Sequence, residues 1–262
     1  MSAWLDEFRQ ALDNAPHPVA FFFRDDDAGW GDNRLVELLD LFARHSLPID
    51  IAAIPAALDS KLGLELRARI EAEPDRLAVH QHGFAHRNHE PEGRRKCEFG
   101  IARSPALQQI DIESGKKRLF DLFGPPISLI FTPPWNRCTA VTGRCLREAG
   151  FRVLSRDATA ASLSLTGLFE LPVTIDWFAQ RKGVRLPFGE LGSALAATIS
   201  TGAPVGVMFH HAVMDDDERQ PASELLAVLT SHGNADCYLM EPLAARLSLN
   251  IASEATTEAG RH

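Results

Sequence analysis

The chain has 262 residues, 45% hydrophobic and 24% charged, with a formal net charge of -8. This composition is ordinary for a soluble protein with a full core, and the length suits one α/β barrel or two small domains. The negative charge disfavours a nucleic-acid-binding surface, and the absence of an apolar run of about 18 residues excludes a conventional membrane-spanning helix.

Segments with strand and helix patterns alternate along the chain with short connections. About seven such units fit, which favours a parallel sheet with outer helices in a single domain over residues 1–251. Residues 252–262 are polar and are expected to form a disordered tail. In chain order, the predicted elements are helix 2–12, strand 18–23, helix 34–45, strand 49–54, helix 62–72, strand 77–79, helix 105–123, strand 128–131, helix 139–149, strand 152–154, strand 167–173, helix 191–199, strand 204–209 and helix 223–231.

The N-terminal segment and the cysteines indicate where the protein resides. Residues 1–14 include three acidic side chains and no unbroken apolar stretch, which is unlike a secretory signal. The four cysteines form no Cys-x2-Cys pair, so reduced, buried thiols are expected and a structural zinc site is not. We therefore expect a cytoplasmic protein, and the sequence leaves its oligomeric state open.

Four polar motifs each follow a predicted strand. They are the triplet Asp25–Asp27, the histidine-rich residues 80–89, the Pro-Pro-Trp segment 133–135 and the pair His210-His211. The loops at the carboxyl ends of parallel strands meet at one face, where active sites form. The motifs are therefore expected to converge although they span nearly 190 positions of the sequence.

Residues 80–89 hold four of the ten histidines. The spacing of His82 and His86 suits one helical turn, with both rings on one face. Two imidazoles and one carboxylate make a catalytic-type metal site with positions left for water. His80 and His89 are candidates for outer contacts, and His80 shares the strand parity of His82. The alternative is a solvated polar loop that binds nothing.

The segment Phe23-Arg24-Asp25-Asp26, followed by His82-x3-His86, resembles the first two motifs of the polysaccharide deacetylase superfamily (NodB homology, carbohydrate esterase family 4). The resemblance implies a distorted (β/α)7 barrel, with Asp25 as general base and Asp26, His82 and His86 as ligands of one divalent metal. Asp27 stands where that family usually has Gly. The register of the motif is therefore open by one residue, and Asp27 is a candidate for an outer contact.

Two later segments resemble further motifs of the same superfamily. In residues 131–136 the resemblance implies that the Trp135 backbone N–H binds the oxyanion, while Thr132 replaces the usual Arg and Arg137 is a candidate for its charge. In residues 205–211 it implies that His210 is the catalytic acid, with His211 as the other candidate. Asp176 is similar to the aspartate that orients the catalytic group.

We therefore expect a metal-dependent hydrolase that removes an acyl group, typically acetyl, from an N-acylated sugar or a related intracellular amide. Zinc is the expected metal, because it suits a site of two His and one Asp with open positions. The expected partner is a small-molecule or oligosaccharide substrate. Two alternatives stay open: an amidohydrolase of the same superfamily acting on small amides or imides, and a non-catalytic barrel that binds metal or carbohydrate.

Overall fold

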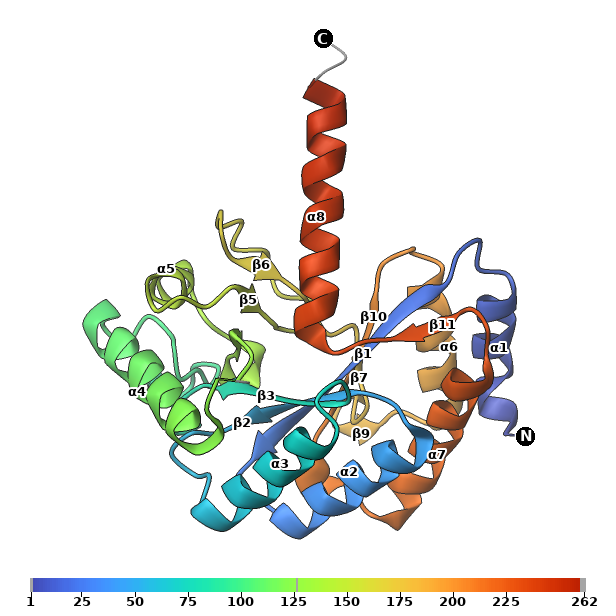
Figure 1. Cartoon of the computed structure of the whole chain (residues 1–262), viewed down its shortest axis with the longest axis horizontal. Helices are drawn as coiled ribbons and strands as arrows, with labels where there is room; N and C mark the ends of the chain where they lie inside the picture. The colour runs from blue at the N-terminus through green and yellow to red at the C-terminus, as the bar shows by residue number, and fades with distance from the viewer. Residues whose placement is uncertain (1, 126, 260–262) are drawn as a thin grey trace.

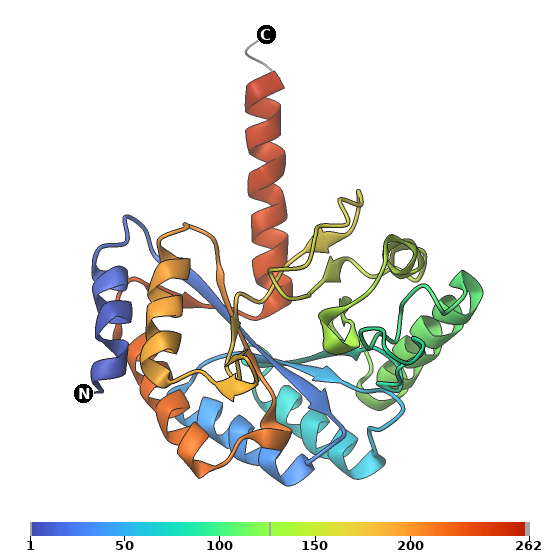
Figure 2. The ribbon, with the colours of Figure 1, turned by 180° about the vertical axis from the view of Figure 1, so that it is seen from behind.

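A parallel sheet curled into a half-barrel forms the centre of this computed structural model, which describes residues 2–125 and 127–259 (Figures 1 and 2). The strands follow the order β6-β5-β4-β3-β2-β1-β10-β7, and β11 pairs with the beginning of β1. The first strand thus lies between β2 and β10, and β11 pairs with its beginning on the β2 edge. The strands of this sheet are β1 (Val19–Ala28), β2 (Ile49–Ala53), β3 (Leu77–His82), β4 (Ile130–Thr132), β5 (Val153–Leu154), β6 (Phe169–Glu170), β7 (Ile175–Asp176), β10 (Val205–Phe209) and β11 (Ala235–Cys237).

Helices cover the convex face of the sheet, and one further helix begins on the concave face and projects away from the body (Figure 1). This arrangement is the α/β half-barrel of a distorted (β/α)7 fold, as expected from the sequence. The helices are α1 (Asp6–Asp13), α2 (Asp32–His45), α3 (Ser60–Ala72), α4 (Pro105–Phe123), α5 (Ala140–Glu148), α6 (Phe188–Ile199), α7 (Asp216–Ser231) and α8 (Met240–Ala259), with short 3-10 turns η1 (Ala3–Leu5), η2 (Pro134–Asn136) and η3 (His211–Val213).

Side chains of β1 alternate between two cores. Phe21 and Phe23 pack outward in the large core shared with the outer helices. Phe22 packs inward against Met208 and the start of α8. Because successive side chains of a strand point to opposite faces, Arg24 and Asp26 follow Phe22 to the inside of the barrel. A hydrophobic strand thus delivers polar groups to the interior at its carboxyl end.

Several predicted boundaries differ from the structure. The aspartate triplet lies within β1 and not in a loop after it, because β1 continues to pair with β2 as far as Ala28. The small antiparallel pair β8 (Gln180–Arg181) and β9 (Val184–Arg185), the strand β11 and the helix α8 have no counterpart among the predicted elements. Residues 252–259, which the sequence predicts to be disordered, belong to the helix α8. Residues 260–262 lie outside the described residues.

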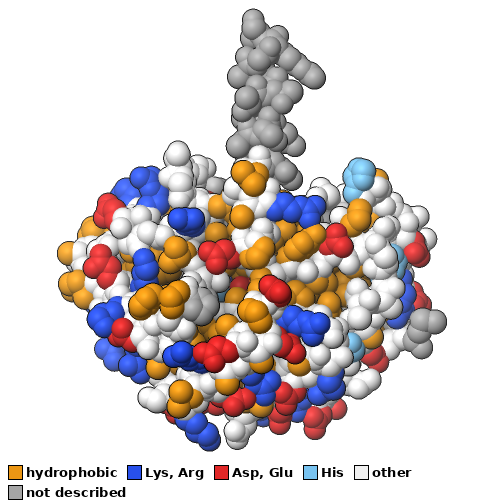
Figure 3. Space-filling view, in the orientation of Figure 1, with side chains coloured by type: hydrophobic (Ala, Val, Ile, Leu, Met, Phe, Trp, Pro, Cys, Tyr) orange, Lys and Arg blue, Asp and Glu red, His pale blue; other side chains and the backbone are white. Residues whose placement is uncertain are grey.

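The start of α8 closes the barrel from the end opposite the polar motifs. Met240, Leu243 and Ala244 are buried in the inner core, and hydrophobic side chains gather around the base of α8 in Figure 3. The buried carboxylate of Asp50 on β2 accepts a hydrogen bond of 2.8 Å from the backbone N–H of Met240. Among the described residues, none forms a helix long and apolar enough to cross a membrane.

Asp50 should make the stability of the protein dependent on pH. Burial raises the pKa of Asp50 from 3.8 to about 8, an effect that the Met240 hydrogen bond only partly opposes. The folded state therefore holds a proton that the unfolded chain releases, so this contribution to the free energy of unfolding falls as pH rises from about 4 to about 8. Replacing Asp50 with Asn is expected to flatten this slope in urea unfolding measured at pH 5 and pH 8. An unchanged slope would contradict the assignment.

Candidate metal centre

The three aspartates of β1 point in different directions because the strand contains a bulge. Asp25 pairs with Ile51 of β2, but Ala28 pairs with Ala53, so β1 has one residue more than β2 in this stretch. Asp27 takes a left-handed conformation (φ 73°). A bulge re-aims the side chain beside it. Two adjacent aspartates, Asp26 and Asp27, can therefore both reach the interior while Asp25 turns the other way.

His82 ends β3, and His86 lies in the loop that follows. The predicted helical turn is wrong: residues 83–89 are irregular, and His86 has φ 52°. Gly83 also has a positive φ, and a Cβ there would lie 2.2 Å from Glu98 Oε2. The buried Glu98 carboxylate accepts hydrogen bonds from the backbone N–H groups of Phe84, Ala85 and Arg87. Glu98 therefore folds the loop that carries His86.

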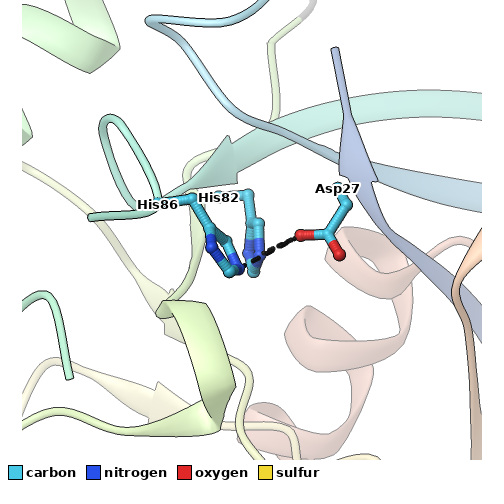
Figure 4. A group of neighbouring side chains, drawn as sticks. All are labelled: Asp27, His82 and His86. Atoms are coloured by element: carbon cyan, nitrogen blue, oxygen red, sulfur yellow. Dashed lines mark ion pairs between the residues drawn. The ribbon is translucent and has the colours of Figure 1, made fainter. Parts of the chain in front are cut away.

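Asp27, His82 and His86 form one cluster of possible metal ligands (Figure 4). Asp27 Oδ1 lies 3.2 Å from His82 Nε2 and 3.2 Å from His86 Nε2. A tetrahedral metal with ligands at 2.0–2.1 Å would hold its ligand atoms about 3.4 Å apart. The two distances from Asp27 to the histidines therefore fit a divalent ion bound between these side chains, whose ligand atoms all lie within 4.8 Å of one another.

The protonation of His82 also fits a cation at this place. His82 Nδ1 lies 3.1 Å from the carbonyl oxygen of Thr132, which can only accept, so Nδ1 carries the proton. In the neutral ring, the lone pair of Nε2 then faces the carboxylate oxygen of Asp27. Burial lowers the pKa of His82, but Asp26 and Asp27 outweigh burial and raise it overall. The site therefore attracts positive charge, as a metal site with an anchored imidazole does.

Asp26, which the resemblance suggested as a ligand, lies outside this cluster. Its two oxygens are bound to Arg24, at 2.8 Å from Nε to Oδ1 and 3.0 Å from Nη2 to Oδ2. Burial would raise the pKa of Asp26, but Arg24 and the neighbouring histidines lower it to about 2. Asp26 is therefore an ionised carboxylate beside the cluster at neutral pH.

Asp25, which the resemblance suggested as the general base, is fully buried against His211. Its Oδ1 accepts the backbone N–H of His211 at 2.9 Å, and its Oδ2 lies 2.5 Å from His211 Nδ1. His211 Nε2 lies 2.6 Å from the carbonyl oxygen of Trp30. With acceptors at both nitrogens, the ring is a doubly protonated imidazolium. Burial lowers its pKa, but Asp25 outweighs this and raises it to about 9.

Removing the Asp25 carboxylate should destabilise the fold. Asp25→Asn leaves a buried imidazolium without its counter-ion, at a cost of about 3–5 kcal/mol. The pair stabilises the folded state fully below pH 6.5, and this stability is lost as pH rises through about 9. Urea unfolding of the variant should show both the lower stability and a flatter pH profile between these values. A variant as stable as the parent protein would exclude the buried ion pair.

His210 is the histidine that lies on the side of the candidate site. Its ring is half-buried, 6.4 Å from the ring of Phe178, and its charge lowers the pKa of both Asp26 and Asp176. Burial nevertheless raises the pKa of Asp176 overall. Asp176 Oδ1 accepts the backbone N–H of Phe178 at 2.9 Å. The structure thus groups His210 and Asp176 near Asp26, and assigns His211 to the Asp25 pair.

The remaining predicted residues lie outside the three-residue cluster. The ring of Trp135, whose backbone is left-handed (φ 56°), is 4.4 Å from the His86 ring. Buried His80 binds Thr132 Oγ1 at 2.9 Å. Arg137 donates to the Lys96 carbonyl oxygen at 3.0 Å. His89 donates its backbone N–H to the Cys97 carbonyl oxygen, with no contact to the cluster within the described residues.

One contributor to the site, Arg24, was not assigned a role from sequence, and the position of Trp30 beside His86 comes from the structure. Arg24 occurs in the first motif. Its contact with Asp26 follows from the strand, because side chains two positions apart in β1 both point to the inner face. Trp30 stacks edge-on against His86 at 4.8 Å and is 42% exposed. His86 is therefore enclosed by two tryptophans, one after β1 and one after β4.

The fold is shared with solved structures of polysaccharide deacetylases and of carbohydrate esterase family 4. The candidate metal site lies at the carboxyl ends of its strands. No protein-family model and no curated protein sequence matches the chain.

Three solved structures illustrate the likeness. A protein of Mycobacterium smegmatis, provisionally named a polysaccharide deacetylase, is 14% identical with a TM-score of 0.70, over 89% of this chain and 92% of the other. A family 4 acetyl xylan esterase from Clostridium thermocellum, in complex with a cobalt ion, is 12% identical with a TM-score of 0.54, over 86% and 89%. A family 4 pseudoenzyme from Bacillus anthracis is 9% identical with a TM-score of 0.53, over 86% and 64%.

Proposed function

We propose that this protein is a metal-dependent deacetylase that hydrolyses an N-acyl group of an acetamido sugar. The observation that carries the proposal is the convergence of Asp27 Oδ1, His82 Nε2 and His86 Nε2, with ionised Asp26 beside them. The solved structures with this fold include enzymes that remove acetyl groups, which supports the same reaction type here.

Asp27, His82 and His86 are the proposed ligands of one divalent ion. Such an ion, which we propose to be zinc, supplies Lewis acidity and an acidified water. Asp26 is the proposed general base: each of its oxygens keeps a second lone pair beyond the one that binds Arg24, so it can accept a proton from water.

The other groups of the site complete the proposed reaction. The Trp135 backbone N–H donates to the substrate oxygen as negative charge develops there. The left-handed backbone at Trp135 persists only because its surroundings hold it, which suits a fixed donor. His210 protonates the leaving amine, and the carboxylate of Asp176 orients it. His211 lacks a free ring nitrogen for this role.

The two tryptophans around His86 support a sugar substrate. Trp30 and Trp135 present aromatic surface beside the proposed metal, and such faces stack on the apolar faces of sugar rings. The substrate class is therefore an N-acetylated mono- or oligosaccharide. A cytoplasmic location of this substrate remains a prediction from sequence.

Metal analysis and a substrate screen test the proposal together. The purified protein, incubated with zinc or cobalt and dialysed, is expected to hold about one ion per chain and to release acetate from N-acetylglucosamine oligosaccharides. His89→Ala is the control that should keep the ion. Activity only on simple amides would reject the sugar substrate. Absence of bound metal, or metal without turnover on either substrate class, would reject the deacetylase.

A further inference from the structure

Arg24 and Asp26 form a bidentate ion pair inside the barrel. Arg24 is fully buried, and its guanidinium binds both carboxylate oxygens, one through Nε and one through Nη2. Both residues lie on the inner face of β1, two positions apart, so the strand itself brings them together. The planar guanidinium matches the plane of the carboxylate and allows it little freedom to rotate.

The guanidinium is itself held from the other strands. Its Nη1 donates to Ser155 Oγ at 2.8 Å, just after β5, and its Nη2 donates to Asn136 Oδ1 at 2.8 Å in η2. Ser155 Oγ in turn donates to the carbonyl oxygen of Leu171 at 2.7 Å. The orientation of Asp26 is thus set by groups from across the barrel.

Asp26 lies beside a cluster that it could join. It is adjacent to Asp27 in sequence, and its buried side chain lies on the inner face of β1. A free carboxylate at this place would be able to bind a metal at the cluster, since carboxylate oxygen is a good zinc ligand. The Arg24 pair holds both oxygens of Asp26 away from that role.

We propose that Arg24 is the positioning residue that separates the functions of the two adjacent aspartates. By holding Asp26 in a fixed orientation, Arg24 leaves Asp27 as the only carboxylate ligand and keeps Asp26 available to accept a proton from water. This inference rests on the proposed function for the role of Asp26, whereas the effect of Arg24 on the ligand set can be tested without activity.

The test compares Arg24→Gln and Arg24→Lys with the control Arg69→Gln. Arg69 also pairs with carboxylates, with Glu65 within α3 and with Asp40 of α2, but does so on the outer helices. The first readout is the visible absorption spectrum of the cobalt-loaded protein. Arg24→Gln should keep about one ion per chain but show a changed spectrum, because Asp26 enters the ligand shell. Arg69→Gln should match the parent spectrum.

The second readout is the steady-state kinetics. In Arg24→Gln, kcat should fall about 100-fold while KM changes less than about threefold, the pattern of a misplaced group that acts after binding. Added methylguanidinium should restore part of kcat, which would not happen if the substitution only loosened the fold. Arg24→Lys should lie between, because its ammonium makes a single contact in place of the fork.

Each outcome decides between the two proposals. An unchanged cobalt spectrum together with an unchanged kcat in Arg24→Gln overturns the positioning role. A changed spectrum in a protein that hydrolyses nothing supports the positioning role and rejects the proposed function. If Arg24→Gln does not fold, Ser155→Ala replaces it, since it removes an anchor of Arg24 without removing charge. The same spectral change is then expected, and its absence overturns the inference.

Discussion

Replacing Asp27 with Ala should remove stoichiometric metal from the protein. Asp27 Oδ1 is the only carboxylate oxygen in the three-atom cluster, so the variant retains two imidazoles alone. Losing a direct ligand should weaken binding by more than the roughly 10–100-fold that loss of an outer partner causes. Dialysis against buffered zinc followed by elemental analysis measures the effect, and turnover should disappear with the metal.

Asp26→Ala is the matched control for the Asp27 variant. Asp26 is adjacent in sequence but bound to Arg24, so its removal should leave the metal content near one ion per chain. The opposite result, with metal lost from the Asp26 variant and kept in the Asp27 variant, would restore the ligand set that the sequence resemblance first suggested. The two variants together thus fix the register of the motif.

Asp26→Asn should keep the metal and lose the reaction. The amide preserves the shape of the carboxylate but cannot accept a proton from water, and loss of a general base typically costs about 10²–10⁴-fold in rate. We expect kcat to fall by that range while the cobalt or zinc content stays near one per chain. Steady-state kinetics on the best substrate of the screen measures the fall.

Asp25→Asn is the comparison that separates catalysis from stability. It should unfold at lower urea concentration, yet the folded fraction should retain kcat within about tenfold, because Asp25 faces His211 and not the cluster. A fall in kcat in Asp25→Asn that is absent in Asp26→Asn would indicate that Asp25 is the general base.

The sequence alone predicts the candidate site but does not assign its aspartates. The triplet and the two histidines were identified because polar groups at the ends of apolar strands are unusual, and the half-barrel followed from the alternation of elements and the family resemblance. Which aspartate faces the histidines depends on the bulge at Asp27, and a bulge is a property of the pairing between β1 and β2. The residue pattern of β1 alone therefore does not predict the bulge.

The loop of His86 shows the same limit for tertiary contacts. The spacing of four residues between His82 and His86 is compatible with a helix, but Glu98, from beyond the loop, binds three of its backbone N–H groups. Tertiary hydrogen bonds of this kind override local periodicity. Likewise Arg24 has its role only because Ser155 and Asn136 meet it across the barrel.

The position of β1 in the sheet affects how the chain is made. One edge of β1 pairs with β2 as soon as those residues exist, but its other edge pairs with β10, which is synthesised nearly two hundred residues later. During translation that edge of an apolar strand has no native neighbour, and open strand edges recruit other chains. Nascent chains that stop before residue 205 should therefore aggregate or require a chaperone. The exposed edge of β1 is covered only when β10 has been synthesised and pairs with it.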